Sequence, residues 1–166
     1  MGKTSNLPRS NSLPKSNLAI AQNYSFRREV GVGAYGIVWA AKNRVSGEEV
    51  AIKKIGSRNF EQSMHAKRAL RELKLLRHLN GNDNITFFID CDTNWNGQAF
   101  TELYLVEGLM EADLHQIIKS GQSLTDQHYQ YFTYQILRGL KWMHGAGVVH
   151  RDIKPGNLLV NSDCEL

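Results

Sequence analysis

The first half of the chain alternates hydrophobic and polar residues in a way that predicts β-strands. From Tyr24 onward, runs rich in β-branched and aromatic side chains are separated by glycine-containing turns. The three successive runs cover residues 26–31, 37–42 and 49–55. Two further runs, residues 85–90 and 103–107, predict two more strands. Residues 1–23 are rich in Ser and Asn and show no periodicity, so we expect a flexible extension there.

Two longer segments carry apolar residues at helical spacing. Residues 60–79 contain no Gly or Pro and predict a long helix. Residues 125–144 predict a second one, with Thr125 as its N-cap and Gly145 and Gly147 as stops. Its apolar face consists of Phe132, Ile136, Leu140 and Met143. A short helix is expected over residues 113–120. Strands therefore dominate the first part and helices the second, which favours an α+β fold.

Composition narrows the class of protein. The 166 residues are 42% hydrophobic and 22% charged, as in an ordinary soluble domain. The net charge of +4 comes from residues 1–28, which hold five basic residues and no acid. A near-neutral body argues against a nucleic-acid-binding domain. No apolar run approaches the ~20 residues of a membrane helix. Two cysteines make neither a disulfide framework nor a CxxC metal site, so we expect reduced thiols.

A glycine-rich segment lies between the first two predicted strands. Gly31, Gly33 and Gly36 form a GxGxxG pattern, which dinucleotide-binding folds also use. There the loop leads into a helix, whereas here the β-branched pair Ile37-Val38 follows directly. The pattern therefore favours a hairpin lying over phosphate groups. The remaining alternative is a glycine-rich hairpin without a ligand.

Lys53 is the second candidate for binding phosphate. It directly follows the run Val50-Ala51-Ile52, which predicts a buried strand. A buried ammonium group must be paired with an opposite charge. We expect the partner on the following helix, where Glu72 is the candidate. Glu61 is the alternative, although it lies close to the start of that helix.

The most informative segment is His150-Arg151-Asp152-Ile153-Lys154-Pro155-Gly156-Asn157. It places a carboxylate, an ammonium and a carboxamide on one short loop in the order HRDxKxxN. Phosphoryl transfer to a hydroxyl group needs a base near the acceptor, a cation near the phosphoryl group and an oxygen ligand for magnesium. Each polar residue of this loop fits one of those tasks.

Together these motifs resemble a eukaryotic protein kinase over about residues 24–166. Lys154, two residues after Asp152, is similar to the serine/threonine class. Residues 67–78 and 109–114 resemble a mitogen-activated protein (MAP) kinase, and residues 117–126 and 155–161 are most similar to the fungal cell-wall-integrity branch. The implied fold is a complete N-terminal lobe, with a five-stranded antiparallel sheet and one long helix, followed by the start of a helical C-terminal lobe. The implied domains are the flexible extension (residues 1–23), the N-terminal lobe with the hinge (residues 24–110) and the start of the C-terminal lobe (residues 111–166).

The resemblance also implies a role for each site residue. Asp152 would accept the proton of a substrate Ser or Thr, Lys154 would neutralise the γ-phosphoryl group, and Lys53, oriented by Glu72, would hold the α- and β-phosphates. Asn157 would bind Mg²⁺, and Glu107 would lie at the back of the adenine pocket. The residues implied in ATP binding are Val30, Gly31, Val32, Gly33, Ala34, Tyr35, Gly36, Val38, Ala51, Lys53, Met110 and Leu159.

In this family, the DFG segment and the activation loop would follow Leu166. We therefore expect these 166 residues alone to be inactive. A non-catalytic nucleotide-binding or interaction fragment is the alternative. The resemblance further implies protein substrates, an upstream MAP kinase kinase, a monomeric state, and a cytoplasmic and nuclear location. It implies no nucleic-acid or membrane partner.

Overall fold

The chain forms two compact units. The computed structural model describes residues 13–15, 18–33, 36–56, 63–95, 97–98 and 100–166. The first unit contains the residues up to Lys74 together with Phe88–Leu109, and the second contains Leu75–Phe87 and Met110–Leu166. The chain passes between the units after Lys74, after Phe87 and after Leu109. The expected boundary at residue 110 assigned residues 75–87 to the first unit, whereas they group with the second.

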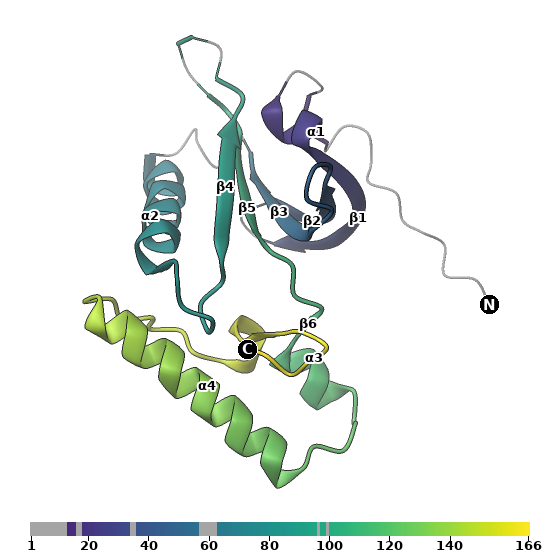
Figure 1. Cartoon of the computed structure of the whole chain (residues 1–166). Helices are drawn as coiled ribbons and strands as arrows, with labels where there is room; N and C mark the ends of the chain where they lie inside the picture. The colour runs from purple at the N-terminus through teal and green to yellow at the C-terminus, as the bar shows by residue number, and fades with distance from the viewer. Residues whose placement is uncertain (1–12, 16–17, 34–35, 57–62, 96, 99) are drawn as a thin grey trace, which may run out of the picture. The chain divides into compact units, whose positions relative to one another are not determined.

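The first unit is built on a five-stranded sheet with strand order β1-β2-β3-β5-β4 (Figure 1). Every neighbouring pair is antiparallel, which confirms the expected sheet. The strands are β1 (Tyr24–Gly33), β2 (Gly36–Asn43), β3 (Glu49–Ile55), β4 (Phe88–Thr93) and β5 (Leu103–Gly108). The long helix α2 (Ser63–Leu79) lies between β3 and β4 in the chain. The expected helix start at residues 60–62 lies outside the described residues.

Strand β4 begins three residues later than its sequence pattern predicts. The expected strand covered residues 85–90, but Ile85 N donates to Asn82 O (3.1 Å), and Asn84 N donates to Asn82 Oδ1 (3.0 Å). These bonds hold residues 82–85 in a turn. Their backbone is therefore committed to the turn, and the strand forms only from Phe88.

The two faces of the sheet carry different side chains. Residues directly opposite each other on neighbouring strands point to the same face. Trp39, Ile52 and Val106 lie opposite one another along β2, β3 and β5, and each is fully buried. We call their side the core face. Val38, Lys53 and Leu105 form the next row and point to the other side, which we call the lysine face.

A short helix, α1 (Ala19–Asn23), covers the core face. Ile20 is 1% exposed and packs in one cluster with Tyr24, Ala41, Val50, Ile52, Tyr104 and Val106. The backbone N–H of Ile20 donates to Asp92 Oδ2 (2.9 Å) on β4. The sequence placed residues 18–23 in a flexible extension, whereas the structure gives them a fixed place. The physical reason is that the core face offers Ile20 an apolar site that a five-residue helix does not reveal through periodicity.

Replacing Ile20 with alanine is expected to lower the free energy of unfolding of the first unit by about 2–4 kcal/mol. The loss has two sources, the apolar area returned to water and the cavity left in the core-face cluster. Urea unfolding measures it. Val45→Ala is the matched control, because the Val45 side chain is 94% exposed, and we expect a change within about 0.5 kcal/mol. Equal unfolding midpoints for both variants would show that α1 does not stabilise the sheet.

The second unit is mainly helical. Its long helix α4 (Asp126–Gly145) begins with a capping box made by Thr125 and His128, which confirms the expected N-cap. The shorter elements are β6 (Ala112–Asp113), α3 (Leu114–Lys119), the 3₁₀ turn η2 (Pro155–Asn157) and β7 (Leu159–Val160). Leu114, Phe132, Val160 and Leu166 form the core. No helix among the described residues is long and apolar enough to cross a membrane.

Candidate active site

The lysine face of the sheet holds the first group of candidate residues. Lys53 Nζ and Glu72 Oε1 of α2 are 2.5 Å apart, and their side chains are 25% and 34% exposed. The pairing expected from the sequence is present. Glu61, the alternative partner, lies outside the described residues. Because Glu72 neutralises Lys53 and limits its rotation, the ammonium group is held on this face, ready to bind an anion.

The glycine segment forms a hairpin, as its sequence predicts. Strands β1 and β2 pair from Tyr24↔Asn43 to Gly33↔Gly36, so no helix follows the glycines. Gly36 has φ +147°, and a Cβ at this position would lie 1.7 Å from Lys54 O. Only glycine therefore allows β2 to begin so close to β3. Ala34 and Tyr35, also expected to contact ATP, lie outside the described residues.

Other candidates surround Lys53 along the strands. Val38 lies directly opposite Lys53 on β2, and Ala51 lies two residues before it on β3, so both share the lysine face. Val30 and Val32 of β1 are exposed, as residues that cover a ligand would be. Gly31 lies opposite Val38, and the space around its Cα is open. Val38, Ala51 and Gly31 thus border Lys53 on its own face. Val32 lies opposite Ile37, which pairs with Lys54, so Val32 belongs to the other face.

Glu107 is a second carboxylate on this face. It lies opposite Ala51 on β3 and opposite Phe88 on β4. Burial raises the pKa of its carboxyl group; Lys53 acts in the opposite direction, and Glu72 raises the pKa further. The sequence placed Glu107 near the adenine ring, but it gave no sign that a second carboxylate lies on the same face as Lys53. The register of β3 with β5 was needed to see this.

The second group of candidates lies on the loop after α4. Asp152 Oδ2 contacts Lys154 Nζ (2.9 Å) and accepts a hydrogen bond from Asn157 Nδ2 (2.9 Å). Asn157 Nδ2 also donates to the Asp152 carbonyl oxygen (2.8 Å). The three residues expected to perform the chemistry are therefore brought together. The bonds from Lys154 and then Asn157 hold the pKa of the Asp152 carboxyl group below its usual value. It therefore stays ionised at neutral pH.

The backbone of this loop is strained at Arg151. Its φ of +68° lies in the left-handed region, which non-glycine residues seldom adopt. Such strain commonly occurs where a chain must aim a functional group. Asp152 N donates to His150 Nδ1 (3.2 Å), so His150 helps to fix the turn. Through this bond His150 supports the loop.

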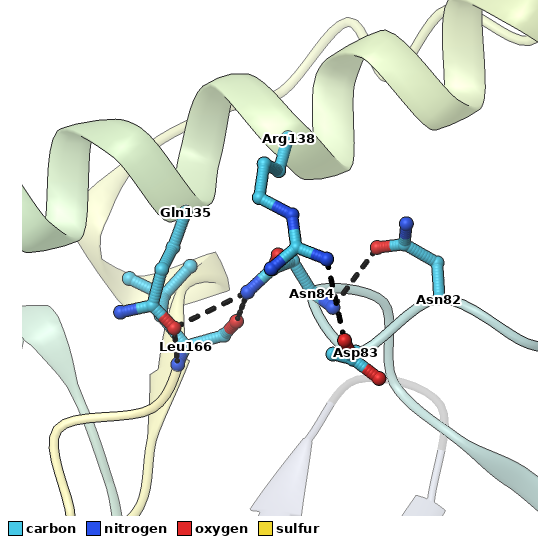
Figure 2. A network of polar contacts seen from close by, with 6 residues as sticks. All are labelled: Asn82, Asp83, Asn84, Gln135, Arg138 and Leu166. Atoms are coloured by element: carbon cyan, nitrogen blue, oxygen red, sulfur yellow. Dashed lines mark hydrogen bonds and ion pairs between the residues drawn. The ribbon is translucent and has the colours of Figure 1, made fainter.

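Polar residues around the buried Gln135 tie the segment after the loop to α4. Gln135 is 3% exposed, and its Oε1 accepts from Leu166 N (2.9 Å) and from Asn84 Nδ2 (3.2 Å). Asn84 Nδ2 also donates to Leu166 O (2.7 Å), and Arg138 contacts Asp83 (3.3 Å) (Figure 2). Gln135 Nε2 donates to Cys164 O (2.9 Å). This network holds residues 164–166, which follow the loop that carries Asp152, against α4 and the turn at residues 82–85. The sequence did not indicate it.

Gly139→Ala is expected to destabilise the second unit by about 1–3 kcal/mol, because overpacking displaces the backbone. A Cβ on Gly139 would lie 2.8 Å from the carbonyl oxygen of Asn84. Gly145→Ala on the same helix is the control, since the space around Gly145 is open. That change should be neutral or stabilise by up to about 1 kcal/mol, because alanine favours a helix. Urea unfolding compares the two variants, and equal destabilisation would contradict the packing argument.

The polar groups on the loop suit magnesium. Mg²⁺ prefers hard oxygen ligands and is usually held by one or two protein groups together with substrate phosphates. Asn157 uses its amide nitrogen to bond Asp152, which leaves its amide oxygen as the atom to bind the metal. Within the described part of the chain, no three His, Cys, Asp or Glu side chains gather into a metal site. The free amide oxygen of Asn157 is a hard ligand and therefore fits an ion that substrate phosphates also hold.

Two hollows in the second unit are formed by other residues. The larger, of about 810 Å³, is lined mainly by α4, including Leu137, Arg138 and Trp142. The smaller, of about 500 Å³, includes Asn84 and Gln135. Neither contains Asp152, Lys154 or Asn157. Met110 and Leu159, both expected near the adenine ring, also belong to this unit, where Leu159 lies opposite Asp113 in the β6–β7 pair.

Comparison with known proteins supports the interpretation of these residues. Residues 24–166 match the family model described as the protein kinase domain. The chain is 56% identical over 147 residues to the mitogen-activated protein kinase mpkA of Aspergillus fumigatus, covering 89% of this chain and 34% of the relative. It is also 56% identical over 147 residues to MPS1 of Pyricularia oryzae, covering 89% of this chain and 35% of that relative.

The yeast relative gives the same result. The chain is 53% identical over 153 residues to the mitogen-activated protein kinase SLT2/MPK1 of Saccharomyces cerevisiae, covering 90% of this chain and 31% of that protein. The resemblance to fungal MAP kinases that the sequence indicated is thereby confirmed. The chain spans about a third of the length of the curated relatives that it matches.

Proposed function

Because the chain belongs to the protein kinase family, we propose that it carries the nucleotide site and catalytic loop of an ATP-dependent serine/threonine protein kinase. The observation that carries this proposal is the assembly of two charged groups, each within one unit. Lys53 is paired with Glu72 on the sheet, and Asp152 is bonded to Lys154 and Asn157 on the loop. Phosphoryl transfer depends on such positioned charges more than on covalent chemistry.

The first unit binds the nucleotide in this proposal. Backbone N–H groups of the β1–β2 hairpin cover the phosphates, and the Lys53 ammonium binds the α- and β-phosphates. Ala51 packs on one side of adenine. Glu72 keeps Lys53 in place, so its role is to position the cation rather than to touch ATP.

The second unit binds the acceptor and the metal. The Asp152 carboxylate accepts the proton of a substrate Ser or Thr hydroxyl group as the oxygen attacks the γ-phosphorus, and the bond from that phosphorus to the bridging oxygen breaks so that ADP leaves. Lys154 stabilises negative charge on that group. Asn157 binds Mg²⁺, which neutralises phosphate charge when ATP is present. Because Lys154 and Asn157 both contact Asp152, one loop holds the base, the cation and the metal ligand close together.

The relatives suggest the biological setting. We extend to this chain the protein substrates and upstream MAP kinase kinase expected for a MAP kinase, and a cytoplasmic and nuclear location. The support is the 53–56% identity to three fungal proteins named as mitogen-activated protein kinases.

A chimera tests the proposal. Residues 24–166 replace the matched segment of the Aspergillus relative, and the purified chimera is incubated with γ-labelled ATP, Mg²⁺ and a general protein acceptor. We expect label on serine and threonine after acid hydrolysis. A folded chimera that binds ATP but transfers no label, while the parent relative does, would favour the alternative of a non-catalytic nucleotide-binding module. Label on tyrosine alone would contradict the assigned acceptor class.

A further inference from the structure

The lysine face holds two carboxylates near one ammonium group. Lys53 lies opposite Leu105, and Ala51 lies opposite Glu107, so Lys53 and Glu107 are diagonal neighbours across β3 and β5. Diagonal neighbours on one face are about 7–8 Å apart at Cα, which long side chains can span. Glu72 approaches the same ammonium from α2. The group therefore contains one positive and two potential negative charges.

The surroundings of Glu107 make the two carboxylates unequal. Strand β4 places the uncharged ring of Phe88 opposite Glu107, and β3 contributes Ala51 and Lys53. Among the residues that the structure describes, the charged groups that act on Glu107 are Lys53 from β3 and Glu72 from α2. Glu72 is already in contact with the ammonium group at 2.5 Å, whereas Glu107 is half-buried beside apolar neighbours.

We propose that Glu107 is a positioning residue that competes with Glu72 for Lys53 and so makes nucleotide affinity depend on pH. When Glu107 is protonated, the net charge of the three groups is zero and Lys53 is available to phosphate. When Glu107 is ionised, the net charge is −1, which draws Lys53 away from phosphate and repels the triphosphate group. The inference rests on the proposed function, because it assigns ATP to the lysine face.

The direction of the pH effect follows from the protonation state. Burial and Glu72 raise the pKa of Glu107, so its carboxyl group ionises above the usual value of about 4.3. The neutral form, which favours nucleotide binding, therefore persists to higher pH than for an exposed glutamate. As pH rises through the raised pKa, the affinity for ATP should fall.

The first experiment measures Mg–ATP dissociation constants for the wild-type chain and Glu107→Gln from about pH 5 to about pH 8. The ratio of the two constants at each pH cancels the titration of ATP itself. We expect wild type and variant to bind alike at low pH and the variant to bind about fivefold more tightly at high pH. Glu49→Gln, which removes an exposed carboxylate from the same strand as Lys53, should leave the ratio at one.

The second experiment needs no nucleotide. The titration of the Glu107 carboxyl group is followed by ¹³C NMR in wild type, Glu72→Gln and Lys53→Met. Neutralising Glu72 should lower the pKa of Glu107, and removing Lys53 should raise it. Glu49→Gln should leave the titration unchanged. Shifts in both expected directions would establish the three-charge group; a Glu107 titration that neither variant moves would overturn it.

The outcomes separate the inference from the proposed function. If ATP binds and Lys53→Met weakens it, but the affinity ratio for Glu107→Gln is independent of pH, the inference is wrong and the proposed function stands. If no variant binds ATP, including wild type, the proposed function and the nucleotide part of the inference are both wrong. The NMR titration then still decides whether the two carboxylates compete for Lys53.

Discussion

Replacing Asp152 with asparagine is expected to lower phosphoryl transfer about 10²–10⁴-fold, the usual contribution of a general base. Asparagine preserves the size of the side chain but cannot accept the proton of the acceptor hydroxyl group. Lys154 and Asn157 keep the Asp152 carboxylate ionised, so the wild-type loop holds a base ready at neutral pH. The rate of γ-phosphate transfer in the chimera with the Aspergillus relative measures the effect.

Two controls make this prediction specific. Mg–ATP affinity should change less than about twofold, since Asp152 acts on the acceptor hydroxyl and removing its charge changes only the reaction step. Asp163→Asn removes an exposed carboxylate elsewhere in the second unit and should leave the transfer rate unchanged. A transfer rate in Asp152→Asn within about threefold of wild type would contradict the role assigned to Asp152, because a general base contributes far more.

Replacing Lys53 with methionine is expected to weaken Mg–ATP binding by roughly 10–100-fold. A hydrogen bond to a charged group contributes about 1.5–3 kcal/mol, and the change also leaves Glu72 as an uncompensated negative charge near the phosphates. Methionine has nearly the same length as lysine, so packing on the lysine face is retained. Equilibrium binding of Mg–ATP to the wild-type chain and the variant measures the loss.

Lys54 provides the matched control, because it neighbours Lys53 and points to the opposite face. Lys54 Nζ contacts Glu102 Oε1 (2.7 Å), and Glu102 Oε2 accepts from the hydroxyl group of Tyr104 (2.7 Å). Lys54→Met should therefore lower stability while leaving Mg–ATP affinity within about twofold, because its partners are on the core face. Equal losses of affinity in both variants would mean that the effect is not local to the lysine face.

Local sequence determined the elements that have strong local signals. The run from Glu49 to Ile55 was predicted at its observed bounds because a β-branched segment is flanked by glycine on both sides. The end of α4 at Gly145 and its N-cap at Thr125 were also readable, since both depend on neighbouring residues. Helix α1 was missed because Ile20 is buried through contacts with the sheet, and five residues are too few to show a helical period.

In the candidate site, too, local sequence indicated some contacts and not others. The bonds of Asp152 with Lys154 and Asn157 span at most five residues, and the partner of Lys53 followed from the need to neutralise a lysine in a buried strand. Gln135 was not identified, because its bonds to Asn84 and Leu166 join residues 51 and 31 positions away.

The relation of Glu107 to Lys53 depends on strand order. In this sheet β3 pairs with β5, so residues about fifty positions apart in the chain become diagonal neighbours. A sequence pattern predicts the strands but not their order, and the second carboxylate therefore became visible only in the folded sheet. The contact of α1 on the core face also depends on strand order, because the Ile20 N–H donates to Asp92 on the edge strand β4.

The most direct test of the account is a crystal structure of the chain with Mg²⁺ and a non-hydrolysable ATP analogue. We expect the triphosphate beneath the β1–β2 hairpin with its α- and β-phosphates bonded to Lys53, and the adenine ring against Ala51. A nucleotide bound at another place, such as the hollow lined by Leu137 and Trp142, would contradict the assignment of the lysine face as the nucleotide site.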